Sequence, residues 1–200
     1  FVFVTADGCS FFAPGYSRND AQAELCRRGM NAAYKAVSAK DADVFLVQYW
    51  TQAEGAPLFA KDGSRVKFAD DAAFVEFAEK GIEKWRKVIG DRQLTVFGQI
   101  PGFDSALSPL DCIARPFRVR DCATSAIDAP KLERVAAMNR QLGASNTGPA
   151  MIDPFSALCG RDTCRNLTDA GEPLYSDNNH LSKWGSAYYA ERLRTGGVIR

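Results

Sequence analysis

The chain has 200 residues, of which 46% are hydrophobic and 24% charged, so it is long enough to bury a sizeable core as one domain. Its 25 basic and 24 acidic residues leave a formal net charge of +1, which creates no field for holding a polyanion and argues against nucleic acid as a partner. No apolar run reaches the ~20 residues that a membrane-spanning helix needs.

The first part of the chain predicts a strand, a helix and a second strand. Residues 1–5 form an apolar run typical of a buried strand, and Gly8 in the following turn can adopt backbone angles that other residues avoid. Apolar residues then recur at three- and four-residue spacing over 21–37, which predicts a helix with Ser17 as a candidate cap. The continuous apolar run 44–47 predicts a strand covered on both faces.

The same alternation continues further along the chain. A helical stripe over 74–89 opens near Asp70, and residues 94–97 predict the strand after it. Pro130 suits the first turn of a third helix that extends to Leu142, and residues 150–153 predict a fourth short strand.

Alternating short strands and amphipathic helices indicate an α/β fold with a mainly parallel sheet and helices on both faces, because parallel neighbours need a crossover connection. In open sheets of this kind, ligands bind beyond the carboxyl ends of the strands. The predicted strand ends carry Asp7, Gly8, Gln48, Trp50, Gln99 and Asp153.

Six cysteines fall into three pairs that are close in sequence, which favours three local disulfides. The pairs are Cys9 with Cys26, Cys112 with Cys122, and Cys159 with Cys164. Sequence alone permits about 15 connectivities, so this pairing is a prediction from proximity. A zinc site is the competing interpretation, but the chain has no CxxC motif and one histidine. Disulfides imply an oxidising compartment. The stretch 102–127, which holds the middle pair, has little periodicity and is predicted to be an irregular surface loop held by a disulfide.

His180, the single histidine, follows Asp177 by three residues. Histidine exchanges protons near neutral pH and is the usual general base when an acceptor holds its other ring nitrogen. Asp177 is a candidate for that acceptor, and the pair would then supply the base and the orienting carboxylate of a nucleophilic triad. The alternative is a structural aspartate that caps the helix starting around Ser182. The hydroxyls of Ser176 and Ser182 are expected to bond to local backbone or to cap the helix.

Several motifs together resemble a known family. The block from Asp177 to Ser182, followed by Gly185 and a short helix, looks like the aspartate-histidine block that ends SGNH hydrolases. The longer run 173–182, placed after a close cysteine pair, is similar to the SGNH domain fused behind integral-membrane acyltransferase-3 proteins. Further matches are Asp7-Gly-Cys-Ser10, residues 44–50 ending in tryptophan, Pro101 after a strand, and the pair Cys112 and Cys122 before an Ala-rich helix.

The resemblance implies a three-layer α/β/α sandwich of flavodoxin-like type that moves acetyl groups onto hydroxyls of a surface polysaccharide such as lipopolysaccharide O-antigen. It implies a periplasmic domain of an inner-membrane protein, which receives acetyl from a membrane acyltransferase domain and needs no metal or other cofactor. Asp177 would orient His180, which would remove the proton from a serine. Backbone N–H groups would stabilise the oxyanion.

The sequence departs from the family pattern in two places. The family's Gly-Asp-Ser motif does not occur, so we expect residues 1–200 to be a single SGNH-like domain truncated at its N-terminus, monomeric in isolation and inactive without the serine. Trp50 stands where the family has an oxyanion asparagine. We assign Trp50 and Gly8 as candidate oxyanion or substrate residues, with core packing and a simple turn as their alternatives. A catalytically silent carbohydrate-binding or docking domain is the competing function.

Overall fold

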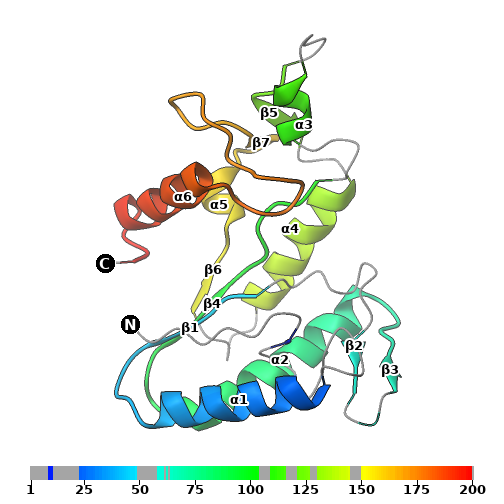
Figure 1. The fold of residues 1–200 in the computed structure, drawn as a ribbon, viewed down its shortest axis with the longest axis vertical. Helices are drawn as coiled ribbons and strands as arrows, with labels where there is room; N and C mark the ends of the chain where they lie inside the picture. Colours follow the sequence, from blue (N-terminus) through cyan, green and yellow to red (C-terminus); the bar gives the residue numbers. More distant parts are fainter. Residues whose placement is uncertain are drawn as a thin grey trace. The chain divides into compact units, whose positions relative to one another are not determined.

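The computed structural model describes the residues 9–10, 23–48, 58–60, 62, 64–103, 109–115, 121–126, 130–144 and 150–199 (Figure 1). The chain divides into two compact units. The first comprises Phe1–Gly98 with Gln141–Met151, and the second comprises Gln99–Arg140 with Ile152–Arg200.

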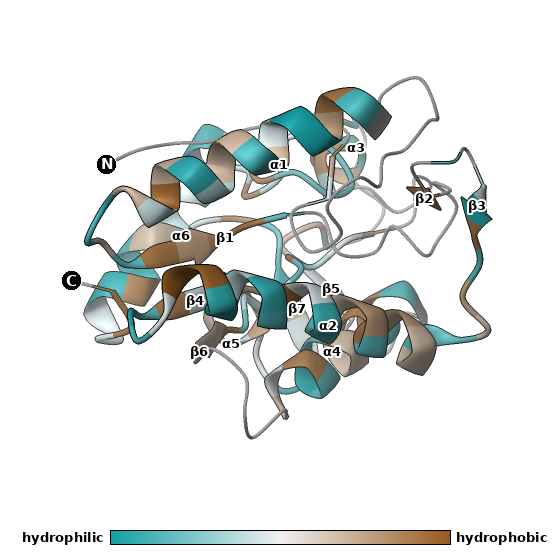
Figure 2. Cartoon of the chain, turned by 90° about the horizontal axis from the view of Figure 1, so that it is seen from below, coloured by the Kyte–Doolittle hydropathy of each residue, from teal (hydrophilic) through white to brown (hydrophobic). Residues whose placement is uncertain are grey.

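Two long helices pack together in the first unit. They are α1 (Ala23–Ser38) and α2 (Asp71–Ile89), and the rings of Tyr34 and Trp85 meet between them with centroids 4.6 Å apart. Figure 2 shows bands of hydrophilic and hydrophobic residues along both helices. The predicted start of α2 is confirmed, because the side chain of Asp70 accepts a hydrogen bond from the N–H of Ala73 and caps the first turn.

The sheet beside these helices has the strand order β1-β4-β6, with β1 (Val44–Leu46) parallel to β4 (Leu94–Phe97) and β6 (Ala150–Ile152) on its other side. Residues 94–96 of β4 are buried, as expected of a central strand. The expectation that 44–47 is covered on both faces is wrong for the described structure, because Phe45 and Val47 are exposed while Leu46 is buried. Alternate side chains of a strand point to opposite faces, and one face of β1 is open. A short antiparallel pair, β2 (Leu58–Phe59) and β3 (Arg65–Val66), was not predicted.

The second unit combines two helices of similar length with several shorter elements. Its elements are α3 (Pro109–Ala114), β5 (Thr124–Ala126), α4 (Pro130–Gly143), α5 (Phe155–Leu158), β7 (Thr163–Arg165) and α6 (Lys183–Thr195). The last three residues of α4 belong to the first unit. Strand β5 pairs antiparallel with β7, so the stretch 102–127, which was predicted to be an irregular surface loop, contains the helix α3 and a paired strand. Its strand was missed because Thr124–Ala126 is too short to show a period.

All three predicted disulfides are present. Cys9 joins Cys26 of α1, Cys112 of α3 joins Cys122, and Cys159 joins Cys164 of β7. The described cysteines therefore leave no free thiol. Each disulfide typically stabilises the folded state by about 2–4 kcal/mol, because it restricts the unfolded chain.

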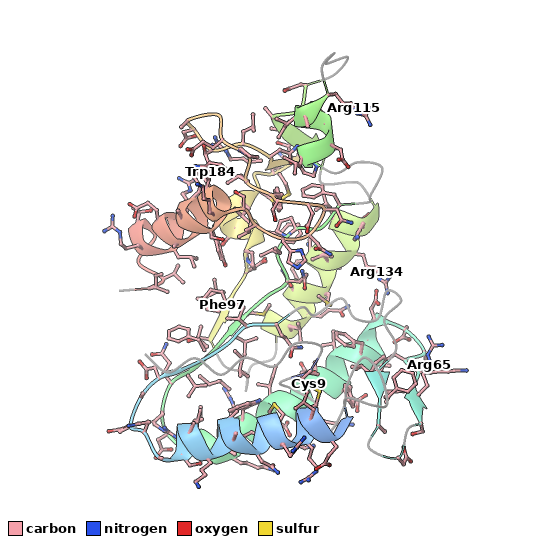
Figure 3. All side chains as sticks on the ribbon, in the orientation of Figure 1. Cys9, Arg65, Phe97, Arg115, Arg134 and Trp184 are labelled. Carbon is pink, nitrogen blue, oxygen red and sulfur yellow. A yellow bond between two sulfur atoms is a disulfide. The ribbon has the colours of Figure 1, made fainter. Side chains whose placement is uncertain are left out.

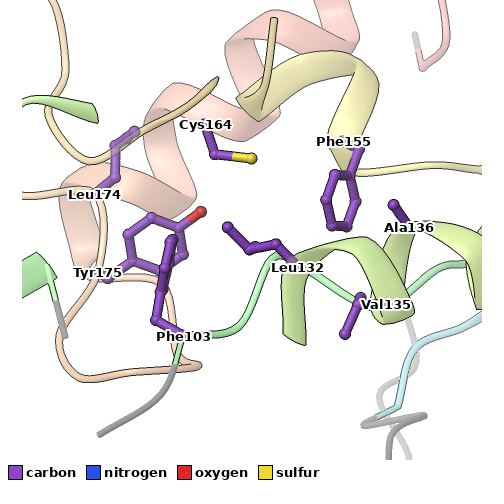
Figure 4. Close-up of a cluster of buried hydrophobic side chains, with 8 residues drawn as sticks. All are labelled: Phe103, Leu132, Val135, Ala136, Phe155, Cys164, Leu174 and Tyr175. Atoms are coloured by element: carbon purple, nitrogen blue, oxygen red, sulfur yellow. The ribbon is translucent and has the colours of Figure 1, made fainter. Parts of the chain in front are cut away.

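A cluster of buried side chains forms the core of the second unit (Figure 4). Its members are Phe103, Leu132, Val135, Ala136, Phe155, Cys164, Leu174 and Tyr175. Phe103 and Tyr175 meet edge to face with ring centroids 4.9 Å apart. Fully burying one such side chain is worth roughly 1.5–3 kcal/mol. This contact therefore holds two segments that are distant in sequence, and both border the candidate site.

Candidate active site

Asp177 and His180 form a hydrogen-bonded pair. Nδ1 of His180 lies 2.7 Å from Oδ2 of Asp177, and both side chains are exposed, 71% for His180 and 48% for Asp177. Because a carboxylate oxygen accepts, Nδ1 carries the proton in this contact and Nε2 is left as the acceptor. The imidazole is therefore held in the orientation and tautomer of a general base.

The other oxygen of Asp177 shapes the loop. Oδ1 accepts hydrogen bonds from the backbone N–H of Asn179 at 2.8 Å and of His180 at 2.7 Å. The loop is closed by the N–H of Ser176, which donates to the carbonyl of His180 at 2.9 Å, and by a bridge between Tyr175 and Leu181. One carboxylate thus folds the turn and orients the ring that the turn carries.

The loop runs directly into α6, and Ser182 caps this helix. The Oγ of Ser182 accepts from the N–H of Gly185 at 3.0 Å and donates to the carbonyl of Pro173 at 2.5 Å. The first turn of α6 packs closely on the backbone of Leu174, since a Cβ on Gly185 would lie 1.9 Å from the Leu174 oxygen. The alternative that Asp177 caps this helix is therefore excluded.

The core of the second unit anchors the same loop from the other side. The N–H of Phe103 donates to the carbonyl of Asn178 at 2.8 Å, and the ammonium of Lys131 donates to the carbonyl of Phe103 at 3.1 Å. Gly102 also borders the loop, because a Cβ at Gly102 would make ordinary contacts with Asn178 and Asn179. The segment that follows β4 therefore supports the Asp177–His180 loop.

A buried amide fixes the start of that supporting segment. Asn139 of α4 is 1% exposed and binds Gln99 in both directions, accepting from its N–H and donating to its carbonyl at 2.9 Å each. Asn139 also donates to Oδ1 of Asp153 at 2.9 Å. Two of the predicted strand ends, Gln99 and Asp153, are thus joined through one helical side chain.

The hydrogen bonds to Asp177 also set its charge state. Burial by itself would raise the pKa of the Asp177 carboxyl, but the donors from the Asn179 N–H, the His180 ring and the His180 N–H outweigh burial and hold the pKa below its usual value. Asp177 is therefore ionised at neutral pH, as an orienting carboxylate must be.

The structure brings together some of the predicted site residues. Asp177 and His180 are paired, whereas Gly8 and Trp50 lie outside the described residues. The hydroxyls of Ser176 and Ser182 bond to the carbonyls of His180 and Pro173, as predicted for local contacts. Within the part of the chain that the structure describes, no group of three or more His, Cys, Asp or Glu side chains is placed to hold a metal ion.

Sequence reasoning missed Asn139 and Lys131. Both lie within a predicted helix, where polar residues are expected on the solvent side. The available signal was that Asn139 directly follows the buried Met138 and precedes the buried Leu142 by three residues, which puts an amide on the apolar stripe. A buried amide needs partners, so that position predicts a contact with another segment.

Comparison with known proteins gives a family and a fold. The family model for the SGNH domain that is fused to AT3 domains matches residues 1–195. No curated protein sequence matches the chain significantly. Among solved structures, the chain is similar to the lipopolysaccharide acetyltransferase periplasmic domain of Salmonella ser. Paratyphi A, with 14% sequence identity and a TM-score of 0.63.

The similarity to the Salmonella structure covers 87% of this chain and 64% of that chain, so residues 1–200 span less than two thirds of that structure. At this identity the likeness concerns the fold. Together with the parallel pairing of β1 and β4 beside α1 and α2, it confirms the predicted α/β class. No helix in the described part of the chain is both long and apolar enough to span a bilayer.

Proposed function

Because this chain belongs to the family of SGNH domains fused to AT3 domains, we propose that it is the extracytoplasmic acyl-transfer domain of a polysaccharide O-acetyltransferase, or an acetylesterase. The acceptor would be a hydroxyl of a cell-surface polysaccharide such as lipopolysaccharide O-antigen. The acetyl donor would be delivered by the membrane acyltransferase domain, and the site of action would be the periplasm. Fusion to AT3 domains and the similarity to a lipopolysaccharide acetyltransferase periplasmic domain support this proposal.

The observation that carries the proposal is the 2.7 Å contact between Nδ1 of His180 and Oδ2 of Asp177. In the proposed reaction, Nε2 of His180 removes the proton from a serine hydroxyl, and the serine oxygen forms a bond to the acetyl carbonyl carbon. The donor's leaving group takes the proton from His180, which leaves an acetyl-serine. His180 then deprotonates the acceptor hydroxyl, and the acceptor oxygen forms a bond to the acetyl carbon. The bond from that carbon to the serine oxygen breaks, and the serine takes the proton back from His180.

The serine in this scheme comes from a Gly-Asp-Ser motif, which residues 1–200 do not contain. We therefore assign the nucleophile to a segment outside these residues. Asp177 would stabilise the imidazolium that forms after each proton transfer, because its carboxylate accepts from Nδ1.

The test uses a form of the protein that includes a Gly-Asp-Ser segment and measures cleavage of p-nitrophenyl acetate. We expect His180→Ala to lower kcat about 100-fold or more, since a positioned general base contributes roughly 10²–10⁴-fold. Asp177→Asn should also lower kcat strongly, because an amide cannot hold the same ring tautomer. Asp162→Asn is the matched control, since Asp162 is an exposed acid outside the loop, and its rate should equal that of the parent. Parent-like rates for His180→Ala would refute the proposed base.

A catalytically silent carbohydrate-binding or docking domain is the second candidate function. Glycan binding without acetyl release, in a form that does carry the serine segment, would favour this second function over the enzyme.

A further inference from the structure

Helix α6 carries a stripe of aromatic and basic side chains. Trp184, Tyr188 and Arg192 follow one another at four-residue intervals, so they lie on one face of the helix. Trp184, in the first turn of α6 (Figure 3), is 39% exposed, whereas Trp85 in the first unit is 2% exposed. Part of the Trp184 indole is therefore open to solvent, where a ligand can reach it.

Three cations accompany these rings. The ammonium of Lys183 lies 4.4 Å from the ring centroid of Trp184, and the guanidinium groups of Arg165 and Arg192 lie 5.5 and 5.8 Å from the ring centroid of Tyr188. Arg165 is paired with Asp169 at 2.5 Å. Within the residues that the structure describes, Lys183 and Arg192 have no carboxylate partner. The stripe therefore presents uncompensated positive charge beside an exposed aromatic ring.

The aromatic and basic side chains of α6 follow the candidate base closely along the chain. Trp184 is four residues after His180, and the segment between them is fixed by the Ser182 hydrogen bonds to Pro173 and Leu174 and by the close packing of Gly185. A ligand bound along the first turns of α6 would consequently keep a constant relation to the His180 loop, which is what an acceptor subsite requires.

From these contacts we propose that Lys183, Trp184 and Arg192, called here the α6 stripe, form a binding subsite for an acidic glycan. Tyr188 packs against the core of the second unit and positions Arg192 beside its ring. This inference rests on the proposed function and adds the chemistry of its acceptor. A sugar ring stacks on the indole of Trp184, and a carboxylate or phosphate substituent of the glycan pairs with Lys183 or Arg192. The indole and the two cations supply binding energy away from the hydroxyl that reacts.

The composition of α6 favours a glycan over a lipid surface. A helix that lies in a membrane interface presents several large apolar residues, with Trp, Phe or Leu along one face. Trp184 is the single large hydrophobic residue exposed on α6. One aromatic ring framed by cations fits a sugar with an anionic group better than it fits an acyl-chain boundary.

The test measures binding of an oligogalacturonic acid to the protein by isothermal titration calorimetry, with a neutral galactose oligosaccharide of the same length as the reference probe. We expect the acidic probe to bind more tightly at low salt and less tightly as salt is added. Trp184→Ala should weaken binding of the acidic probe about tenfold, and Trp184→Phe should retain most of the affinity because a ring remains. Arg192→Gln should weaken it a few-fold.

Arg194→Gln is the matched control, since it removes the same charge from α6 at an arginine paired with Glu191, outside the stripe. Equal affinities for Trp184→Ala and Arg194→Gln, or no binding of the acidic probe, would overturn the proposal. So would Trp184-dependent partition onto phosphatidylcholine vesicles containing 30% phosphatidylglycerol in the absence of oligosaccharide binding, because the stripe would then be a lipid contact.

Failure of the subsite and failure of the proposed chemistry are distinguishable. His180→Ala should abolish ester cleavage and leave oligosaccharide affinity unchanged. Loss of affinity in Trp184→Ala, with parent-like cleavage in His180→Ala, would support the subsite and refute the base.

Discussion

Gly185→Ala tests how the loop that carries the candidate base is fixed. The added methyl group would lie 1.9 Å from the carbonyl oxygen of Leu174 and 2.8 Å from its carbonyl carbon, and both are backbone atoms. Carbon and oxygen atoms normally approach to about 3.3 Å at closest. The methyl group therefore fits only if α6 or the Leu174 backbone moves. That movement would disturb the Ser182 cap and the segment that leads back to His180.

The magnitude follows from two opposing effects. Overpacking costs about 1–3 kcal/mol, and two backbone segments that cannot rotate away put Gly185→Ala at the upper end. The exchange of glycine for alanine inside a helix returns up to about 1 kcal/mol. We expect a net loss of roughly 2 kcal/mol or more in the free energy of unfolding, which lowers the Tm of a protein of this size by about 4–8 °C.

The assay compares thermal and urea unfolding of Gly185→Ala with that of Gly143→Ala. Gly143 ends α4, is exposed, and its added methyl would make an ordinary contact with the Met151 sulfur at 3.5 Å. This control should be neutral or slightly stabilising. If both variants unfold at the parent midpoint, the close packing of α6 on Leu174 is not a constraint on the fold.

Further variants test the buried amide, the buried tyrosine and the acid dependence of the loop. Asn139→Leu removes the hydrogen bonds that Asn139 makes to the N–H and the carbonyl of the buried Gln99, so the free energy of unfolding should fall by about 2–6 kcal/mol. Gln141→Leu on the exposed side of α4 should change it by less than about 0.5 kcal/mol, and similar urea midpoints for the two variants would contradict this. Tyr175→Phe should leave the melting temperature unchanged or raise it, because the hydroxyl points into the apolar cluster (Figure 4) and has no hydrogen-bond partner in the described structure. A marked loss of stability would mean that the Tyr175 hydroxyl does have a hydrogen-bond partner. Because the pKa of Asp177 is lowered in the folded state, its stabilising contribution is present above the ordinary carboxyl pKa and is lost as the pH falls through the lowered value. The unfolding midpoints of the parent and of Asp177→Asn should therefore converge in acid. A difference between them that stays constant from pH 7 to pH 3 would refute this.

The candidate base and its orienting carboxylate were predictable because both belong to one short segment. The three-residue spacing of Asp177 and His180, followed by Ser182 as a helix cap, restricts the local backbone enough to suggest their contact, and the structure places Nδ1 2.7 Å from Oδ2. The cysteine pairs were predictable for the same reason, because each pair closes a short loop.

The support of the site could not be read from local patterns. Phe103 and Asn178 are distant in sequence, and so are Asn139 and Gln99, yet each pair shares a hydrogen bond. No residue near Asn139 in the sequence indicates which buried backbone groups its amide will satisfy. The same holds for the cations around Tyr188, since Arg165 reaches it from β7 and Arg192 from α6.

The sequence by itself indicated the local features: the helix and strand alternation, the three disulfides, the cap at Ser182 and the aspartate-histidine pair. Each of these arises from interactions between residues that are close along the chain, where backbone geometry leaves few alternatives. The tertiary structure decided which distant backbone groups hold the His180 loop and which side chains surround α6. Those contacts form only when the core of the second unit packs, because burial of Phe103 and Tyr175 brings their segments within hydrogen-bonding distance.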